Sequence, residues 1–142
     1  MDQINIREFH YPEDYSHVVN IWERIEKGVR VGVSDAPKEI EKKLLRDPDL
    51  FLVAESKGTL IGTVIGGFDG RRGYIYHLAI SSEFRGKGIG TRLMNELEMR
   101  LRAKGCIRCH LLVNNNNDEA KGFYDSKGWK ALDDTIFAKD LG

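Results

Sequence analysis

Residues 85–90 read Arg85-Gly86-Lys87-Gly88-Ile89-Gly90 and join an apolar run at 74–80 to an amphipathic stretch at 89–104. This order predicts a strand, a glycine-rich turn and a helix. The first amides of a helix have no partner inside it and lie at the positive end of its dipole, so the turn suits a phosphate. Its arginine and lysine, together with Arg92, favour a ligand that carries several phosphates. The alternative is a turn that only changes the direction of the chain.

The chain is balanced in charge and has a length that suits one domain. Its 142 residues include 22 Lys and Arg against 22 Asp and Glu, which gives a formal net charge of zero. We therefore expect a single domain over residues 1–142. Proteins that bind nucleic acids depend on clustered cations, so this balance predicts no nucleic-acid partner.

The apolar stretches are short. None approaches the ~20 apolar residues that a membrane-spanning helix needs. The N-terminus lacks the basic start and apolar core of a secretory signal. We expect no membrane partner and a cytoplasmic location.

Cys106 and Cys109 form a lone Cys-x-x-Cys pair. A structural zinc site needs four ligands, and the thioredoxin pair opens a helix, whereas these two lie between a helix end and a strand. We predict no metal site and two reduced thiols, one of them in the core.

Hydrophobic periodicity and turn residues divide the chain into alternating strands and helices. The expected elements are a strand at 4–8, a helix after Pro12 that ends near Gly28, an extended connector at 29–33, a helix from Pro37 that ends by Pro48, strands at 50–56, 59–68 and 74–80, a helix at 89–104, a strand at 107–113, a short helix that ends at Gly128, and a hairpin of 129–132 and 135–139. A strand, a crossover helix and a strand predict that 74–80 and 107–113 pair in parallel.

Alternation along 74–80 predicts which side chains share a face of that strand. One face carries Tyr74, Tyr76, Leu78 and Ile80, and the other carries Ile75, His77 and Ala79.

Two common phosphate-binding patterns do not match the turn. The Walker pattern fails because the glycines are not followed by Lys and Ser or Thr at the required places. The dinucleotide pattern fails because the sixth position, counted from Gly86, is Thr91. What remains is Arg-x-x-Gly-x-Gly between a strand and a helix, with an Asn and a Tyr downstream.

Two motifs resemble those of the GNAT superfamily of N-acetyltransferases. They are Leu78-Ala79-Ile80-Ser81-Ser82-Glu83-Phe84-Arg85-Gly86-Lys87-Gly88-Ile89-Gly90, and Asn117-Asp118-Glu119-Ala120 followed by Phe123-Tyr124 and Lys127-Gly128-Trp129. The resemblance implies an α/β (α+β) fold with a mixed, mostly antiparallel sheet of six to seven strands, a splayed parallel central pair and about four helices.

The resemblance also implies acetyl-CoA as co-substrate, without a metal. The residues implied to bind it are Leu78, Ala79, Ile80, Arg85, Gly86, Lys87, Gly88, Ile89, Gly90, Thr91 and Asn117. The amides of the glycine turn would bind the pyrophosphate, and one amide near Leu78 to Ile80 would act as an oxyanion donor. Tyr124 is the expected general acid, because a phenol with a pKa of ~10 can protonate a thiolate whose conjugate acid has a pKa near ~8.5.

The general base and the acceptor are less constrained by the sequence. Many family members place Glu on one of the splayed strands, where this chain has Tyr74, Tyr76 and Leu112. His77 is a weak candidate for the base, beside a packed or hydrogen-bonded histidine as the simpler interpretation, and Glu23, Asp69 or a water relay are weaker still. The expected partner is a small-molecule or peptide amine, which would lie near 28–35 and the closing hairpin.

Acidic Glu23, Glu26 and Asp35 would suit a cationic amine, although a solvated surface explains them equally well. A non-catalytic acyl-CoA-binding or regulatory module and a nucleotide-phosphate binder are the alternative functions. A homodimer is possible by analogy of fold.

Overall fold

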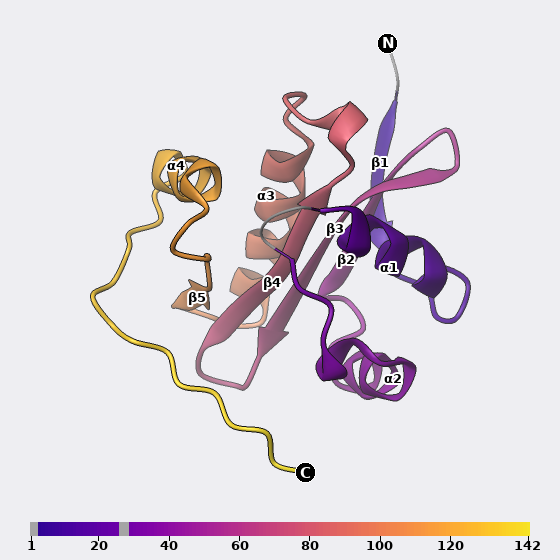
Figure 1. Cartoon of the computed structure of the whole chain (residues 1–142). Coiled ribbons are helices and arrows are strands. Elements are labelled where there is room, and N and C mark those ends of the chain that lie inside the picture. The colour runs from indigo at the N-terminus through magenta and orange to yellow at the C-terminus, as the bar shows by residue number, and fades with distance from the viewer. Residues whose placement is uncertain (1–2, 26–28) are drawn as a thin grey trace.

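The computed structural model describes residues 3–25 and 29–142 (Figure 1). Its elements are β1 (Ile4–Glu8), α1 (Tyr15–Arg24), the 3₁₀ turn η1 (Val33–Asp35), α2 (Pro37–Arg46), β2 (Phe51–Ser56), β3 (Thr59–Phe68), β4 (Gly73–Ile80), the 3₁₀ turn η2 (Ser82–Phe84), α3 (Ile89–Ala103), β5 (Cys109–Leu111) and α4 (Asp118–Ser126). The predicted end of the first helix at Gly28, and Glu26, lie outside the described residues. No helix in the described ranges has the length and apolar character to cross a membrane.

The strands form one mixed sheet in the order β1-β2-β3-β4-β5. Neighbouring strands are antiparallel except β4 and β5, which pair in parallel across the α3 crossover. This confirms the expected α/β class and the parallel pair. The expected count of six to seven strands is not met, because the described residues form five.

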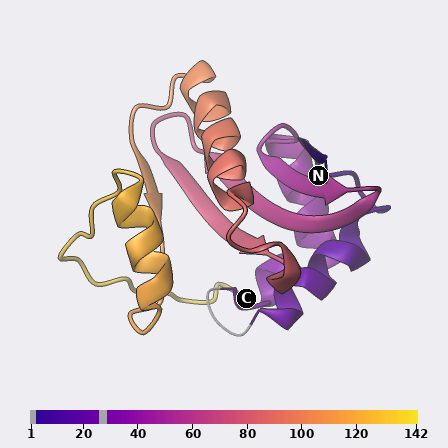
Figure 2. The same ribbon diagram turned by 90° about the horizontal axis from the view of Figure 1, so that it is seen from above.

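Helices cover both faces of this sheet (Figure 2). On one face, α3 packs Leu93 and Leu97 against inward side chains of β2 and β3. On the other face, α1 and α2 pack Trp22 and Ile40 over Phe51. The four-residue spacing of apolar side chains in α3 therefore buries one stripe, as the sequence predicts.

A bulge in β4 changes the predicted faces of that strand. Thr63 pairs with Ala79 and Ile65 with Tyr76, so β4 has one residue more than β3 between these pairs. His77 lies in the extra length with a φ of 51°. Because one inserted residue reverses the facing of everything beyond it, the alternation does not run through the whole strand.

The packing shows the reversal on both sides of the bulge. Ile75 belongs to the α3 side, whereas Ala79 belongs to the side of α1 and α2. Leu78 and Ile80 pack against the α3 side, unlike Tyr74 and Tyr76, which are exposed. The prediction of two unbroken faces was therefore wrong.

The predicted closing hairpin at 129–132 and 135–139 is absent, since residues 127–142 contain no strand. This segment runs past β5 without pairing to it (Figure 1). Ile136 and Phe137 are adjacent and both exposed, so the stretch buries no single face that would hold it on the sheet. The strand predicted at 107–113 is likewise shorter, at Cys109–Leu111.

Candidate active site

The parallel strands β4 and β5 separate halfway along β4. Their pairing runs from Gly73 and Cys109 to Ile75 and Leu111 and then stops. Within residues 3–25 and 29–142, the edge of β4 that faces β5 has no strand partner from beyond Ile75 up to Ile80. We call this diverging region the β4–β5 opening. The backbone groups expected to bind the acyl-CoA arm, those of Leu78, Ala79 and Ile80, lie on it.

The glycine loop, residues 85–90, follows β4 and η2 and leads into α3. Gly86 and Gly88 have φ values of 76° and 79°, a region that favours glycine, and Gly88 is the residue that caps α3. Among the described residues, the amides of 86–91 have no hydrogen-bond acceptor, and the first to donate is that of Arg92, to the carbonyl of Gly88 at 3.1 Å. These free amides include those of Lys87, Ile89, Gly90 and Thr91. Free amides at a helix start are the donors that the predicted anion site requires.

The cations of this region differ in where they point. The Nε of Arg85 donates to the carbonyl of Ile80 at 3.2 Å, which holds this side chain at the end of β4. The ammonium of Lys87 lies 5.2 Å from the centre of the Phe84 ring. Arg92 instead donates to the carbonyl of Ile4 at 3.1 Å, so it joins α3 to the edge strand. Arg85 and Lys87 therefore remain the cations of the loop itself.

Helix α4 begins at Asn117, whose side-chain oxygen accepts the amide of Ala120 at 3.1 Å. Asn117 is buried, and its capping role is an observation that the motif alone did not supply. A Cβ on Gly90 would lie 3.6 Å from the Phe123 ring, so the start of α3 and the middle of α4 are in contact. This contact brings the two motifs together in space.

Tyr124, also on α4, is half-buried between neighbouring aromatic rings. Phe123 and Trp129 lie edge-on to it, with ring centres at 5.2 and 6.2 Å. Burial raises the pKa of Tyr124 to about 12. The hydroxyl therefore stays protonated throughout the neutral range, which an acid requires.

His77 is held by a buried carboxylate. Its Nε2 lies 2.9 Å from Oδ1 and 3.0 Å from Oδ2 of Asp35, and its ring meets the edge of Trp22 at a centre distance of 4.8 Å. Asp35 also accepts the amide of Gly32 at 3.0 Å. Burial alone would raise the pKa of Asp35, but these hydrogen bonds hold it below its ordinary value. The pairing of Asp35 with His77 has no local signal in the sequence, because the two residues are 42 positions apart.

A short buried network fixes the backbone at His77. The indole nitrogen of Trp22 donates to the hydroxyl of Thr63 at 2.9 Å, and that hydroxyl donates to the carbonyl of His77 at 2.9 Å. Trp22 and Thr63 are fully buried. The bulge is thus held in one conformation from the α1 side of the sheet.

The other base candidates lie differently. Asp69 accepts the amides of Arg71 and Arg72, both at 2.8 Å, in the turn before β4, at the end where β4 and β5 are still paired. These backbone hydrogen bonds lower the pKa of Asp69. Glu23 is exposed on α1. Neither carboxylate borders the β4–β5 opening as His77 does.

The side chains expected to occupy the positions of the family's glutamate are exposed. Tyr74 and Tyr76 stack with ring centres 6.2 Å apart and are 38% and 44% exposed. Leu112 is 58% exposed. None of the three is a carboxylate, and of residues 76–80 only His77 carries a basic nitrogen in its side chain.

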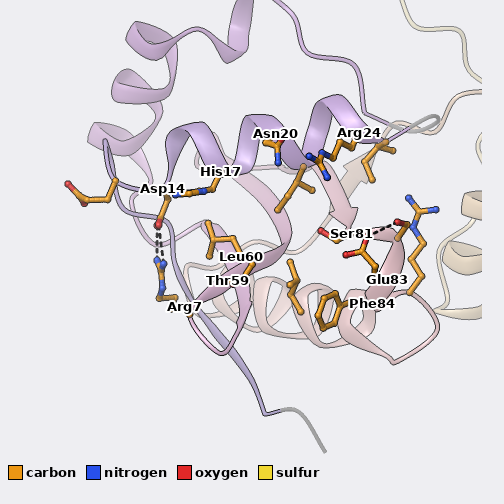
Figure 3. Close-up of a pocket in the computed structure, with 17 residues that line it drawn as sticks. Arg7, Asp14, His17, Asn20, Arg24, Thr59, Leu60, Ser81, Glu83 and Phe84 are labelled. Carbon is orange, nitrogen blue, oxygen red and sulfur yellow. Dashed lines mark hydrogen bonds and ion pairs between the residues drawn. The ribbon is translucent and has the colours of Figure 1, made fainter.

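A cavity of about 430 Å³ lies between α1, the β2–β3 turn and η2 (Figure 3). On α1 the cavity is lined by the polar side chains of His17, Asn20 and Arg24 together with the apolar Ile21. Of the residues predicted to bind the co-substrate, Arg85 alone borders it. The cavity therefore lies beside the glycine loop and apart from the β4–β5 opening.

Cys106 and Cys109 are free thiols, and Cys106 lies in the core, as predicted. Burial raises the pKa of the Cys109 thiol to about 12, so this sulfur is a poor nucleophile. Within residues 3–25 and 29–142, no group of three or more His, Cys, Asp or Glu side chains could hold a metal ion.

Comparison with known proteins agrees with this geometry. The model of the acetyltransferase (GNAT) family matches residues 10–129. Acetyltransferase ECA0875 of Pectobacterium atrosepticum is 40% identical over 129 residues, which cover 91% of this chain and 90% of that protein. The chain therefore belongs to the GNAT family of acetyltransferases.

Solved structures show the same fold. Ard1 from Thermoplasma volcanium is similar with a TM-score of 0.76 and 27% identity, over 88% of this chain and 81% of that one. PaiA N-acetyltransferase from Thermoplasma acidophilum, in complex with coenzyme A, has a TM-score of 0.80 at 23% identity, over 94% of this chain and 93% of that one.

Proposed function

We propose that this protein transfers the acetyl group of acetyl-CoA to an amine by direct attack in a ternary complex. The observation that carries the proposal is the β4–β5 opening, which begins at Ile75 and Leu111 and leads to the free amides of the glycine loop. Together these two features would offer donors for a pyrophosphate and an unpaired strand edge for an extended arm. The acetyltransferase family and the coenzyme A bound to the PaiA N-acetyltransferase support this reading.

In this proposal the amides of 86–91 bind the pyrophosphate, with Arg85 and Lys87 as mobile cations beside them. The pantetheine arm hydrogen-bonds to the edge of β4 along Leu78 to Ile80, and Asn117 lies on its other side. An amide at the bulge donates to the thioester oxygen as negative charge develops there, an interaction worth about a hundredfold or more in rate.

Tyr124 is the proposed acid for the departing sulfur. The amine nitrogen forms a bond to the carbonyl carbon, the C–S bond breaks, and the thiolate takes the phenolic proton. With a phenol pKa of about 12 against ~8.5 for a thiol, full transfer is uphill by about 5 kcal/mol. Tyr124 therefore contributes mainly as a hydrogen-bond donor while charge builds on sulfur, and the proton follows as the thiolate relaxes.

The acceptor is proposed to be a small-molecule or peptide amine. It would approach from the side of α1 and α2, where Tyr74, Tyr76 and the segment from Arg30 to Ser34 are exposed. No metal is needed for this chemistry, because the charge that develops is met by backbone amides and a phenol.

Titration calorimetry with acetyl-CoA tests the binding step, and lack of binding at millimolar ligand would refute the proposal. Release of free thiol in the presence of polyamines, aminoglycosides, amino acids and peptide N-termini tests the transfer and identifies the acceptor class. Binding without thiol release from any of these amines would instead favour a non-catalytic acyl-CoA-binding module.

A further inference from the structure

We propose that Asp35 and His77 form a catalytic pair, in which His77 Nδ1 accepts the proton of the attacking amine and Asp35 positions the ring. This inference rests on the proposed acetyl transfer and assigns its general base. Asp35 is a positioning residue, because its carboxylate contacts His77 and not the reacting atoms.

The hydrogen bond between Asp35 and His77 has a defined direction. Asp35 is 7% exposed, and the hydrogen bonds that lower its pKa keep it ionised at neutral pH, so its oxygens only accept. Nε2 of His77 must therefore carry the proton that it shares with Asp35. In the neutral ring, Nδ1 then has the free lone pair.

The lone pair on Nδ1 of His77 has no hydrogen-bond partner among the described residues. In the same part of the chain, only Nδ1 of His110 is both enclosed and without a partner. Nδ1 of His77 is therefore not enclosed. An imidazole with one nitrogen on a carboxylate and the other open is an arrangement that suits a general base.

The backbone at His77 is held in an unusual conformation. A φ of 51° is unusual for a residue with the bulk of histidine, and such conformations persist where the surroundings enforce them. Here Thr63 holds the carbonyl of His77, and Trp22 holds Thr63. The bulge places His77 on the α1 side of the sheet, at the point where β4 has lost its β5 partner.

Few charged groups oppose this assignment. The titratable groups that face His77 or its partner come from two elements. Asp35 lies on η1, and Tyr15 lies on α1 and donates its hydroxyl to the Asp35 carbonyl at 2.7 Å. The remaining contacts on the described chain, with Trp22 and Thr63, do not titrate. Asp35 is thus the charge that stabilises the imidazolium formed when the proton arrives.

The proton balance is complete without a further reactant. As the nitrogen–carbon bond forms, the amine proton passes to Nδ1 of His77, while the sulfur receives the proton of Tyr124. The imidazolium then returns its proton to solvent, and the phenolate takes one up. No group is oxidised or reduced.

The test compares His77→Asn and Asp35→Asn with the unaltered full chain, using the amine of the acceptor panel that gives the fastest thiol release. Asn tolerates the left-handed backbone better than most residues, so His77→Asn removes the base and keeps the bulge. We expect it to lower kcat by about 100-fold or more, with acetyl-CoA affinity unchanged within about twofold. His10→Asn, at an exposed histidine, is the matched control and leaves kcat unchanged.

The pH profile distinguishes a base from a structural histidine. A general base acts in its neutral form, so kcat/KM should fall on the acid side of the profile. Asp35→Asn removes the charge that stabilises the imidazolium, so the acid limb moves to lower pH by about one unit. The Asn amide can also donate to Nε2, which places the proton on Nδ1, and kcat falls by about tenfold or more.

Long-range ¹H–¹⁵N NMR spectra give a readout that does not depend on activity. The proposal requires the neutral ring of His77 to carry its proton on Nε2, and Asp35→Asn to move it. Two results would overturn the assignment and leave the acetyl transfer intact. One is a proton on Nδ1 in the unaltered protein, and the other is an acid limb that is unchanged in both variants while transfer proceeds. If the unaltered protein transfers acetyl to none of the amines, the proposed function is refuted, and so is the role of His77 as its general base.

Discussion

Gly88 caps the start of α3 with a left-handed backbone, and the Gly88→Ala variant tests whether the glycine loop binds the co-substrate. The φ of Gly88 is 79°, and a Cβ there would meet nothing within 4 Å. The cost to folding is therefore the strain of the backbone alone, about 1–2 kcal/mol. At about 4 °C per kcal/mol for a chain of this size, Tm should fall by about 4–8 °C.

Binding should suffer separately from folding. The new methyl group lies among the free amides of 86–91, where a phosphate would have to approach. Loss or lengthening of one hydrogen bond to a charged group costs about 1.5–3 kcal/mol. Since 1.4 kcal/mol is tenfold in Kd, titration calorimetry should show acetyl-CoA binding weakened by about 10- to 100-fold.

Gly70→Ala is the matched control for this variant. Gly70 has a φ of 100°, a Cβ there would also meet nothing within 4 Å, and it lies in the turn at the opposite end of β4. It should lose a similar amount of stability and keep its acetyl-CoA affinity. If Gly88→Ala bound acetyl-CoA as tightly as Gly70→Ala, the amides of the glycine loop would not be the anion site.

Three further substitutions test the acid, the core and the buried carboxylate. Tyr124→Phe should lower kcat by about 10-fold or more with acetyl-CoA affinity kept, and unchanged turnover would remove Tyr124 as the acid. Gly66→Ala would bring a Cβ to 2.7 Å from Leu97 Cδ1, so chemical denaturation should show a loss of about 1–3 kcal/mol; no loss would mean that α3 can shift on the sheet. Because its pKa is lowered in the folded state, ionised Asp35 stabilises the fold at pH values above the ordinary aspartate pKa of about 3.9. This stabilisation is lost as the pH falls below that value and the carboxylate is protonated. Thermal unfolding between pH 6 and pH 3 should therefore show a smaller decrease in Tm for Asp35→Asn than for the unaltered chain, and equal decreases would contradict the pairing with His77.

Local chemistry was sufficient to predict most of the fold. Lys57 and Gly58 adopt φ values of 51° and 80°, the conformation that a two-residue hairpin turn requires, and Lys-Gly between two apolar runs predicts it. The apolar spacing in α3 and its glycine entrance predict a helix from Ile89, where the structure begins it. These signals are carried by neighbours in sequence, so they can be read without knowing the tertiary structure.

The prediction of a closing hairpin was wrong for a different reason. Strand propensity in 129–139 expresses a preference for a half-buried pleated surface, and the described fold offers that segment none. β5 has three residues, and its outer edge is too short to hold a neighbour of five. Propensity alone could not show that the partner surface was missing.

In the candidate site, too, local features could be predicted from the sequence and long-range contacts could not. The free amides of 86–91 could be predicted because they are consecutive in the chain, and the motif places them at a helix start. The pairing of Asp35 with His77 could not, because it depends on a one-residue bulge that turns His77 toward η1. A bulge changes the count of residues between two pairs and leaves no mark in composition or periodicity.

Thr63 offers a direct test of what that bulge requires. Thr63→Val keeps the shape of the side chain and removes the hydroxyl that serves both Trp22 and His77. The buried indole N–H and the His77 carbonyl would then lack partners, which costs about 1–3 kcal/mol. Chemical denaturation measures this loss, and kcat should fall with it because the carbonyl of His77 is released. Thr59→Val, the same change at an exposed position of β3, should alter stability by less than about 0.5 kcal/mol. If Thr63→Val lost stability and kept full kcat, the network would hold the core without positioning His77.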